Sequence, residues 1–428
     1  MLLRFEVSNF KSIFEPVEFS MMALDSERSS VRRFDALNEG VLCVAGVYGP
    51  NASGKTNLVE SLAWLSFAVR SSLRSFDEVI PREPFKFGNG PTSPTSYRVE
   101  MIVDGVRYEY RLELSDSRIL SEALYSFPFV KRRKLFERKD MELTFRRGLK
   151  GLTGTRELMT PTTLVLSAAV RLDDEEIRPF GVALGSITQV GLRRRTSIPR
   201  VLDRYLPAVT ESLFLSTNPA LQASLFEDGS STRLSERDQA LELLRFADLG
   251  IDDIRVVEDG GSNSDEVPTG LRDNRRQIRF IHRIADQAMP FEWREESAGT
   301  RTWFHLLGPM LGALNRGGIL LIDEVEASLH PRLSACLIEL FESPDSNPKN
   351  GQLIFTTHDT SLLNFLNRDE VWFTERSKDG STVLTALADF AGDKVRKSLN
   401  LERAYLQGRF GAVPEFDQFL LHHALGLI

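Results

Sequence analysis

The sequence of 428 residues is poor in cysteine and has no long apolar run. Its two cysteines, Cys43 and Cys336, are too few for a disulfide framework or a thiolate metal site, so we expect both in the core. No apolar window is long enough to predict a membrane-spanning helix, and the first residues lack a signal-peptide pattern. Sustained heptads and internal repeats are also missing, which argues against a long coiled-coil arm. We therefore expect a cytoplasmic protein without membrane contact.

The composition is that of a globular chain, with 42% hydrophobic and 26% charged residues. The net charge of -7 argues against a surface adapted as a whole to nucleic acid. Two basic runs, residues 131–134 and 193–195, are local exceptions. They would suit DNA or an acidic protein, but a solvated surface gives the same pattern, so both interpretations stay open.

One segment carries an explicit chemical signal. Residues 49–56 read Gly-Pro-Asn-Ala-Ser-Gly-Lys-Thr and fit the phosphate-loop pattern G-x-x-x-x-G-K-[ST]. In such a loop, backbone N–H groups surround the phosphates, Lys55 adds a positive charge near the β- and γ-phosphates, and the Thr56 hydroxyl binds Mg²⁺. The expected nucleotide-binding residues are Gly49, Asn51, Ala52, Ser53, Gly54, Lys55, Thr56 and Asn57. The sequence therefore predicts a protein that binds ATP with Mg²⁺.

The flanking residues agree with this motif. Residues 41–47 form a short apolar run of strand type, and residues 57–69 carry apolar side chains at helical spacing. A strand, a glycine-rich turn and a helix whose positive end faces the anion are the context that phosphate binding requires.

Other periodicities outline the organisation of the chain. Alternating runs at the amino terminus, and again on both sides of Asp104-Gly105, predict antiparallel hairpins. Helical patterning dominates from about residue 156 to 249, most clearly at 236–246. We expect an α/β protein with a mixed sheet, an antiparallel β-subdomain and an inserted helical region. The expected divisions are 1–155 for the N-terminal lobe, 156–249 for the helical insertion and 250–428 for the C-terminal lobe.

A second strand complements the phosphate loop. Residues 318–322 are continuously apolar and end at Asp323 and Glu324. Because ligands bind at the carboxyl ends of parallel strands, Asp323 is expected to bind Mg²⁺ and Glu324 to activate the attacking water. A further apolar strand from residue 352 is expected to lead to His358. This histidine would either donate a hydrogen bond to the γ-phosphate or lie in the core as a satisfied side chain.

Upstream, Ser297, Gly299 and Thr300 begin a helical segment. Small residues at a helix start suit an anion, but an ordinary N-cap by Ser297 or Thr300 explains them equally well.

These motifs together resemble a known group. In chain order they are residues 49–56, 297–300, 319–324, 328–331 and 356–358. This set is similar to the ABC-type ATPase heads of the SMC, RecF and OLD proteins, in which two heads enclose two ATP molecules. The resemblance implies a homodimer or higher homo-oligomer.

The resemblance also implies roles for individual residues. Ser297, Gly299 and Thr300 would form the signature that contacts the γ-phosphate bound by the partner copy. Glu324 would be the hydrolytic base and His358 the switch, with Lys55 completing the catalytic group. Ser328 and His330 would belong to a loop that faces the dimer partner.

A narrower resemblance concerns residues 248–254 and 405–414. They look like segments of bacterial RloA/AbiL-type ATPases of anti-phage defence, related to the ATPase of the PARIS system. This resemblance implies an abortive-infection role, with an RloB-like, Toprim-type nuclease as a separate partner and a phage protein as the trigger. About 50 residues follow the last head strand, so a nuclease would act in trans.

One residue expected from the resemblance has no counterpart, and an alternative function stays open. No glutamine lies between Asn57 and Thr188, so the glutamine that helps to hold Mg²⁺ in ABC heads has no assignment. A RecF-like DNA repair or recombination clamp is the alternative function, and ATP-dependent, salt-sensitive DNA binding would favour it. A transporter subunit fits less well, because residues 328–331 and the missing glutamine do not suit it.

Overall fold

The computed structural model describes residues 1–128, 131–146, 153–191, 209–215, 234–247, 250–258, 276–390 and 400–411, and the single residues 423 and 425. The chain divides into two compact units. The larger unit comprises Met1–Thr196, Ala313–Glu326 and Ser334–Ile428, and the smaller unit comprises Ser197–Gly312 and Ala327–Leu333. Within the described ranges, no helix is both long and apolar enough to cross a membrane.

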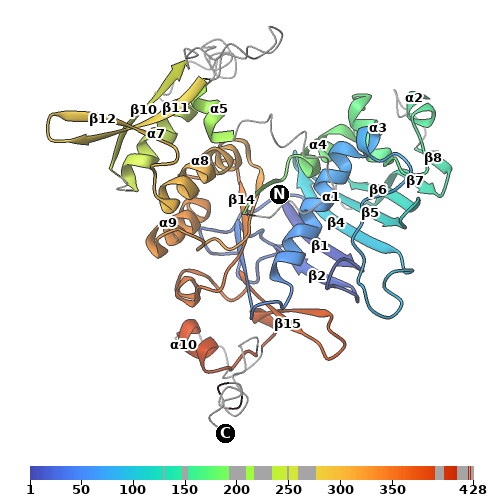
Figure 1. Cartoon of the computed structure of the whole chain (residues 1–428). Coiled ribbons are helices and arrows are strands. Elements are labelled where there is room, and N and C mark those ends of the chain that lie inside the picture. Colours follow the sequence, from blue (N-terminus) through green and yellow to red (C-terminus); the bar gives the residue numbers. More distant parts are fainter. Residues whose placement is uncertain are drawn as a thin grey trace. The chain divides into compact units, whose positions relative to one another are not determined.

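A six-stranded sheet forms the centre of the larger unit (Figure 1). Its order is β16 (Thr382–Ala386), β15 (Val371–Arg376), β3 (Val44–Tyr48), β14 (Gln352–Thr356), β13 (Ile319–Ile322) and β9 (Thr188–Val190). All neighbours are parallel except β15 and β16. Every residue of β3, β13 and β14 is buried, which explains the continuous apolar sequence of β13 and the apolar centre of β14 between Gln352 and Thr356. The strands predicted from residues 41, 318 and 352 are confirmed with shifted bounds.

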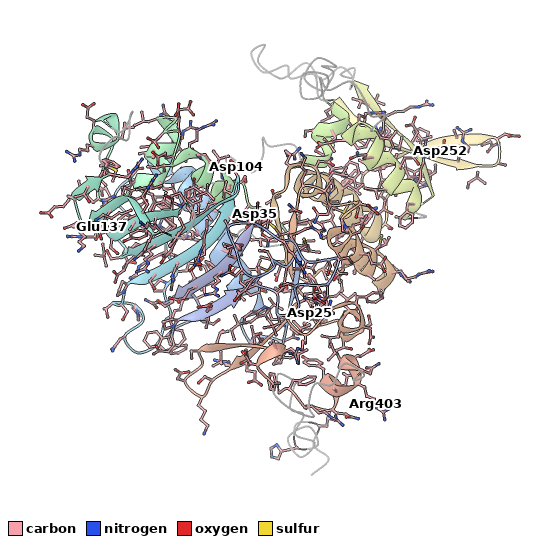
Figure 2. The ribbon with its side chains drawn as sticks, turned by 180° about the vertical axis from the view of Figure 1, so that it is seen from behind. Asp25, Asp35, Asp104, Glu137, Asp252 and Arg403 are labelled. Carbon is pink, nitrogen blue, oxygen red and sulfur yellow. The ribbon has the colours of Figure 1, made fainter. Side chains whose placement is uncertain are left out.

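A seven-stranded antiparallel sheet forms the second layer of this unit. Its order is β2 (Val17–Ser20), β1 (Leu2–Ser8), β4 (Thr95–Val103), β5 (Val106–Leu114), β6 (Ile119–Phe127), β7 (Arg133–Lys139) and β8 (Glu142–Phe145). Both predicted hairpins are confirmed. Asp104, labelled in Figure 2, and Gly105 turn with φ values of 50° and 76°, in the left-handed region that a tight hairpin needs.

Helix α1 (Lys55–Ser75) joins the two sheets of the larger unit. Its buried stripe includes Leu58, Leu62 and Leu65, as the spacing predicts. The ring of Trp64 stacks on Tyr97 of β4 at 5.3 Å, while other residues of α1 contact β13 and β14. The helix is longer than the predicted 57–69 and begins at the lysine of the phosphate loop.

The smaller unit combines helices with a three-stranded antiparallel sheet of order β10 (Ile251–Glu258), β11 (Arg276–Ile284) and β12 (Gln287–Glu292). Helix α7 (Glu236–Phe246) has the predicted bounds, and its N-cap Ser235 accepts a hydrogen bond from the Asp238 amide. Helices α5 (Val209–Leu215) and α8 (Ala298–Arg316) complete this core, in which the buried Trp303 ring donates to the Leu243 carbonyl at 3.1 Å. From Ala313 onward, α8 belongs to the larger unit.

The compact units divide the chain elsewhere than expected. Helices α3 (Val165–Arg171) and α4 (Arg178–Gly185) pack on α1, and β9 pairs with β13, so these elements belong to the larger unit and not to a helical insertion. Residues 250–312, expected in the C-terminal lobe, belong to the smaller unit. Helical periodicity does not distinguish a helix that covers a sheet from one in a separate domain, and a three-residue strand is too short to show a period.

Several elements complete the chain. They are α2 (Thr153–Glu157), α9 (Pro331–Glu342), the 3₁₀ helices η1 (Thr360–Phe365) and η2 (Leu387–Asp389), and α10 (Leu401–Leu406). Arg403 of α10 is labelled in Figure 2. The basic run 193–195 lies outside the described residues. So do residues 248–249 and 412–414, which belong to the segments 248–254 and 405–414 that resemble RloA/AbiL-type ATPases.

Candidate nucleotide-binding and hydrolysis site

The predicted phosphate loop connects the carboxyl end of β3 to the start of α1. Gly49 and Gly54 have φ values of 149° and 108°, which favour glycine. A Cβ atom on Gly49 would collide with the Thr374 carbonyl, and one on Gly54 would collide with the Thr382 hydroxyl. Both glycines are therefore required by conformation and by space, and the loop has the form of a phosphate cradle.

Neighbouring strands support the loop. The Ser53 hydroxyl lies 2.6 Å from that of Thr374 in β15, and the Thr382 hydroxyl of β16 donates to the Ser53 carbonyl at 2.9 Å. Asn57 donates to the Ser12 hydroxyl, in the turn that follows β1. Ser53 and Asn57 thus hold the loop in shape, whereas Asn51 and Ala52 are exposed at its apex.

Lys55 lies across the loop. Its Nζ donates to the carbonyls of Gly49 at 2.8 Å and of Pro50 at 3.1 Å. Burial lowers the pKa of Lys55, while the negative charges of Glu326, Glu324 and Asp323 act in the opposite direction. An anionic phosphate at this place would further favour the charged lysine.

Thr56 and Asp323 meet as the sequence predicts. The Thr56 hydroxyl donates to the two carboxylate oxygens of Asp323 at 2.9 and 3.1 Å. A hydroxyl and a carboxylate in contact beside a phosphate loop fit Mg²⁺, which binds few protein ligands and retains water. In the described part of the chain, no group of three or more histidine, cysteine or acidic residues could hold a metal, so a cation here would need phosphate oxygens and water as further ligands.

A residue of the 356–358 motif, to which the sequence interpretation gave no role, joins this pair. Strand β14 lies between β3 and β13, and Thr356 at its end donates to Asp323 Oδ1 at 2.6 Å. The same hydroxyl accepts the Glu324 amide at 2.8 Å. Glu324 is exposed and has a φ of 52°, unusual for a non-glycine residue and typical of functional sites. Thr356 therefore positions both the expected metal ligand, Asp323, and the expected base, Glu324.

His358 follows β14 but is not part of it, because the strand ends at Thr356. Its side chain is 59% exposed, so it is not a satisfied core residue. Glu326 Oε1 accepts hydrogen bonds from the His358 amide at 2.9 Å and lies 2.8 Å from its Nδ1. The sequence interpretation did not select Glu326. Its signal was a third acidic residue two positions after Glu324.

A glutamine also lies next to the acidic strand end. Gln189 in β9 pairs with Leu321, and the following Val190 carbonyl accepts the Asp323 amide at 3.0 Å. A Cβ atom on Gly191 would contact the Asp323 carbonyl, so the two segments approach closely. Gln189 immediately follows the stretch from Asn57 to Thr188, which contains no glutamine.

The signature and loop residues come together within the smaller unit. Ser297 Oγ accepts the Thr300 amide at 3.0 Å and caps α8, so the N-cap interpretation holds for the folded chain. A Cβ atom on Gly299 would lie 2.9 Å from the Ser328 carbonyl. Exposed Ser328 has a φ of 65°, and exposed His330 accepts the Arg332 amide at the start of α9. The two segments expected to face a partner copy are therefore adjacent to each other.

The basic run at 131–134 is largely paired. Arg132 lies 3.5 Å from Glu109 and 3.7 Å above the Tyr125 ring, and Lys134 donates to Glu137 at 2.7 Å. These contacts favour the interpretation as a structured, solvated surface.

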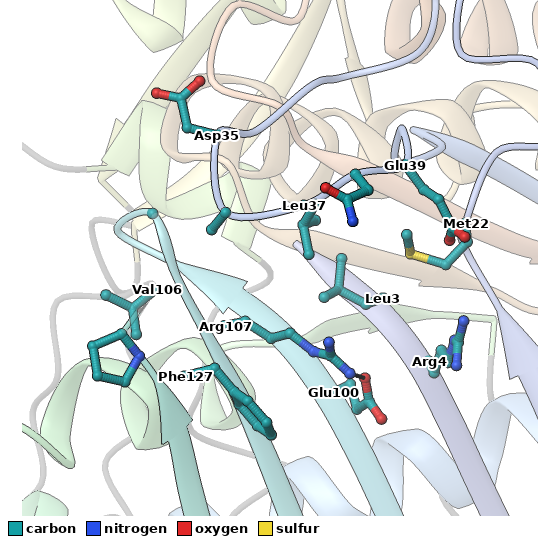
Figure 3. Close-up of a pocket in the computed structure, with 14 residues that line it drawn as sticks. Leu3, Arg4, Met22, Asp35, Leu37, Glu39, Glu100, Val106, Arg107 and Phe127 are labelled. Carbon is teal, nitrogen blue, oxygen red and sulfur yellow. Dashed lines mark hydrogen bonds and ion pairs between the residues drawn. The ribbon is translucent and has the colours of Figure 1, made fainter. Parts of the chain in front are cut away.

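A cavity of about 700 Å³ in the larger unit is separate from the phosphate loop. In Figure 3, Arg107 reaches Glu100 and lies beside Phe127, near Arg4 and Leu3. Oppositely charged side chains line it, and no residue of the phosphate loop does.

A comparison with protein families identifies the chain. The family described as "AAA domain, putative AbiEii toxin, Type IV TA system" matches residues 44–151 and 169–364, which include the phosphate loop, Asp323 and His358. The chain belongs to this family. As a member, it carries an ATPase domain of the ATP-hydrolysing type, and ATP with Mg²⁺ is what such domains use in general.

Solved structures of SMC heads are similar to this family member at low identity. An SMC head bound to the C-winged helix domain of ScpA is 14% identical, with a TM-score of 0.42. The SMC head domain from Thermotoga maritima is also 14% identical, with a TM-score of 0.37. Each match covers 90% of this chain and 98% of the other. None of the curated proteins compared with the chain matches it.

Proposed function

We propose that two copies of this chain enclose ATP between them, hydrolyse it, and use the ATP state to hold or release a separate toxic effector in anti-phage defence. The hydrolytic part rests on one observation above all. The hydroxyls of Thr56 and Thr356, from the two sides of the site, converge on the Asp323 carboxylate, with Glu324 next in the chain. Such a cluster beside a phosphate loop suits binding and hydrolysis of a nucleoside triphosphate.

The residues take the following roles in this proposal. The loop amides and Lys55 hold the phosphates, and Thr56 and Asp323 hold Mg²⁺, which when bound neutralises phosphate charge. Glu324 orients the attacking water and takes its proton. Gln189, in the strand next to Asp323, is the counterpart of the missing glutamine.

The partner copy supplies the remaining contacts. Ser297, Gly299 and Thr300 would meet the γ-phosphate held by the other chain, and Ser328 and His330 would line the same interface. Their adjacency in the smaller unit supports a common role, since one surface would then carry both segments.

Family membership supports a role in a toxin–antitoxin system, and the sequence resemblance alone supports a separate effector. The family description names a toxin of a toxin–antitoxin system. Effectors of the RloB-like, Toprim type, released in the cytoplasm by a phage protein, are the partners that we propose.

The test combines turnover with assembly. ATPase rates and sedimentation with ATP and Mg²⁺ are measured for the wild type, Lys55→Ala and Glu324→Gln, with Lys349→Ala as an exposed lysine control. We expect Lys55→Ala to lose nucleotide binding. Glu324→Gln should bind ATP, hydrolyse it at least 100-fold more slowly and accumulate dimers, because general base catalysis contributes about 10²–10⁴ in rate.

The same samples are tagged and recovered together with the products of neighbouring genes. A stoichiometric partner that leaves on addition of a phage protein would support the effector proposal. Recovery of DNA without a partner would favour the RecF-like clamp. Wild-type turnover in Glu324→Gln would refute its assignment as the base.

A further inference from the structure

Two groups of His358, its backbone amide and its Nδ1, contact the same oxygen atom of Glu326. Glu326 Oε1 lies 2.9 Å from the His358 amide and 2.8 Å from its Nδ1. An ionised carboxylate can only accept a hydrogen bond, so Nδ1 of His358 carries the proton. The other ring nitrogen, Nε2, then lies on the edge of the ring that faces away from Glu326. A side chain that is 59% exposed is thus held in one rotamer and one ring orientation.

The backbone on both sides of His358 is also fixed. The Thr357 amide donates to the Val47 carbonyl of β3 at 3.1 Å, two residues before the phosphate loop. The Thr357 hydroxyl accepts the Asp359 amide at 2.9 Å, and Asp359 in turn caps η1 through the Ser361 amide. With its backbone fixed, His358 could still rotate its side chain, and the contact with Glu326 restricts this rotation.

Glu326 itself is set in a costly environment. Its side chain is only 14% exposed, and among the described residues its Oε2 is buried without a hydrogen-bond partner. A buried carboxylate oxygen without a partner destabilises the folded chain, so a glutamate at this position calls for a compensating role. Its negative charge acts on Lys55, which places it at the phosphate-binding end of the sheet.

We infer that Glu326 is a positioning residue, which orients His358 so that Nε2 faces the γ-phosphate of bound ATP. The inference rests on the proposed ATP hydrolysis and extends it to a residue outside the motifs of the sequence. Glu326 acts through His358 and does not touch the nucleotide.

A double-mutant cycle tests this dependence. The kcat and KM for ATP are measured for the wild type, Glu326→Ala, His358→Ala and the double variant. We expect Glu326→Ala to lower kcat by about 10- to 100-fold, as is typical for the loss of a hydrogen bond to a charged group, with a smaller change in KM. In the His358→Ala background, the same substitution should change kcat less than twofold. Equal losses in both backgrounds would overturn the inference.

Two further variants separate positioning from folding and from charge. Glu326→Gln keeps an oxygen acceptor for the Nδ1 proton and should retain kcat within about threefold. A loss as large as that of Glu326→Ala would instead assign the effect to the charge near Lys55. Glu339→Ala, an exposed glutamate on α9, should leave kcat unchanged.

The outcomes for the two proposals are distinct. A wild-type protein that binds ATP without hydrolysing it would refute the proposed function. An active wild type with independent effects of Glu326 and His358 would refute only the positioning role.

Discussion

At the residue scale, a single hydroxyl links the expected metal ligand to the expected base. Thr356 Oγ1 donates to Asp323 and accepts the Glu324 amide. Because a valine has nearly the same shape without this hydroxyl, Thr356→Val removes both bonds and leaves the packing of β14 largely intact.

We predict that Thr356→Val lowers ATP turnover about tenfold and raises the Mg²⁺ concentration needed for half-maximal activity. Its free energy of unfolding should fall by about 1 kcal/mol, the net contribution of a buried hydrogen bond. Thr356→Ser retains the hydroxyl and should behave like the wild type in a Mg²⁺ titration of turnover. Equal activity of the valine and serine variants would contradict the role of Thr356.

At this scale, the sequence predicts the functional residues that belong to local patterns. The glycines, Lys55, Thr56 and Asp323 follow from contiguous motifs, and their predicted proximity is confirmed for Thr56 and Asp323. Thr356 received no role although its motif was recognised, and Glu326 and Gln189 were missed, because the relevance of all three comes from neighbours that are distant in the chain.

At the element scale, Ser297, immediately before α8, combines an observed role with a proposed one. Ser297 caps the helix in the folded chain, and we propose that it also contacts a phosphate bound by the partner copy. Capping requires only a side-chain acceptor, whereas phosphate contact requires a donor without negative charge.

We predict that Ser297→Asp keeps the stability of the wild type but abolishes ATP-dependent dimers, since the carboxylate caps well and repels phosphate. Ser297→Ala should lose about 1 kcal/mol of stability through the missing cap. Ser297→Arg should bind ATP as a monomer, because its bulk occupies the place of the phosphate. Thermal unfolding and sedimentation with ATP measure both effects, and ATP-dependent dimers in the aspartate variant would limit Ser297 to capping.

The type of element was predictable wherever the local pattern was long. The hairpin at Asp104-Gly105 and the helix after Ser235 have the expected positions. By contrast, the location of α3, α4 and β9 in the larger unit depends on contacts with α1 and β13, which no local pattern contains.

At the scale of the whole molecule, an acidic pair in the larger unit makes stability depend on pH. Burial, followed by the charge of Glu370, raises the pKa of Glu342 to about 7. Arg28 pairs with Glu370 at 3.4 Å and with Asp369 at 2.7 Å, but among the described residues the buried Glu342 Oε1 has no hydrogen-bond partner. A carboxyl whose pKa is raised on folding stabilises the protein at low pH, and this contribution is lost as pH rises from about 4.5 to about 7.

We predict that Glu342→Gln raises the free energy of unfolding at pH 8 by about 1 kcal/mol, less than the full pKa difference implies because the side chain is only partly buried. The gain should shrink as pH falls toward 4.5, where the native glutamate is already neutral. Urea unfolding across this pH range provides the measurement, with Glu18→Gln, an exposed glutamate on β2, as the control. A gain that is independent of pH would contradict the proposed titration.

The position of β3 has a consequence for synthesis of the chain. Its two hydrogen-bonded neighbours, β14 and β15, begin at Gln352 and Val371, some 300 residues later. A nascent chain therefore leaves the ribosome with both edges of a fully apolar strand exposed, the state most prone to aggregation. The contact of Thr56 with Asp323, on which the proposed ATP site depends, cannot form until most of the chain has been translated, so we expect unfinished copies to lack that site.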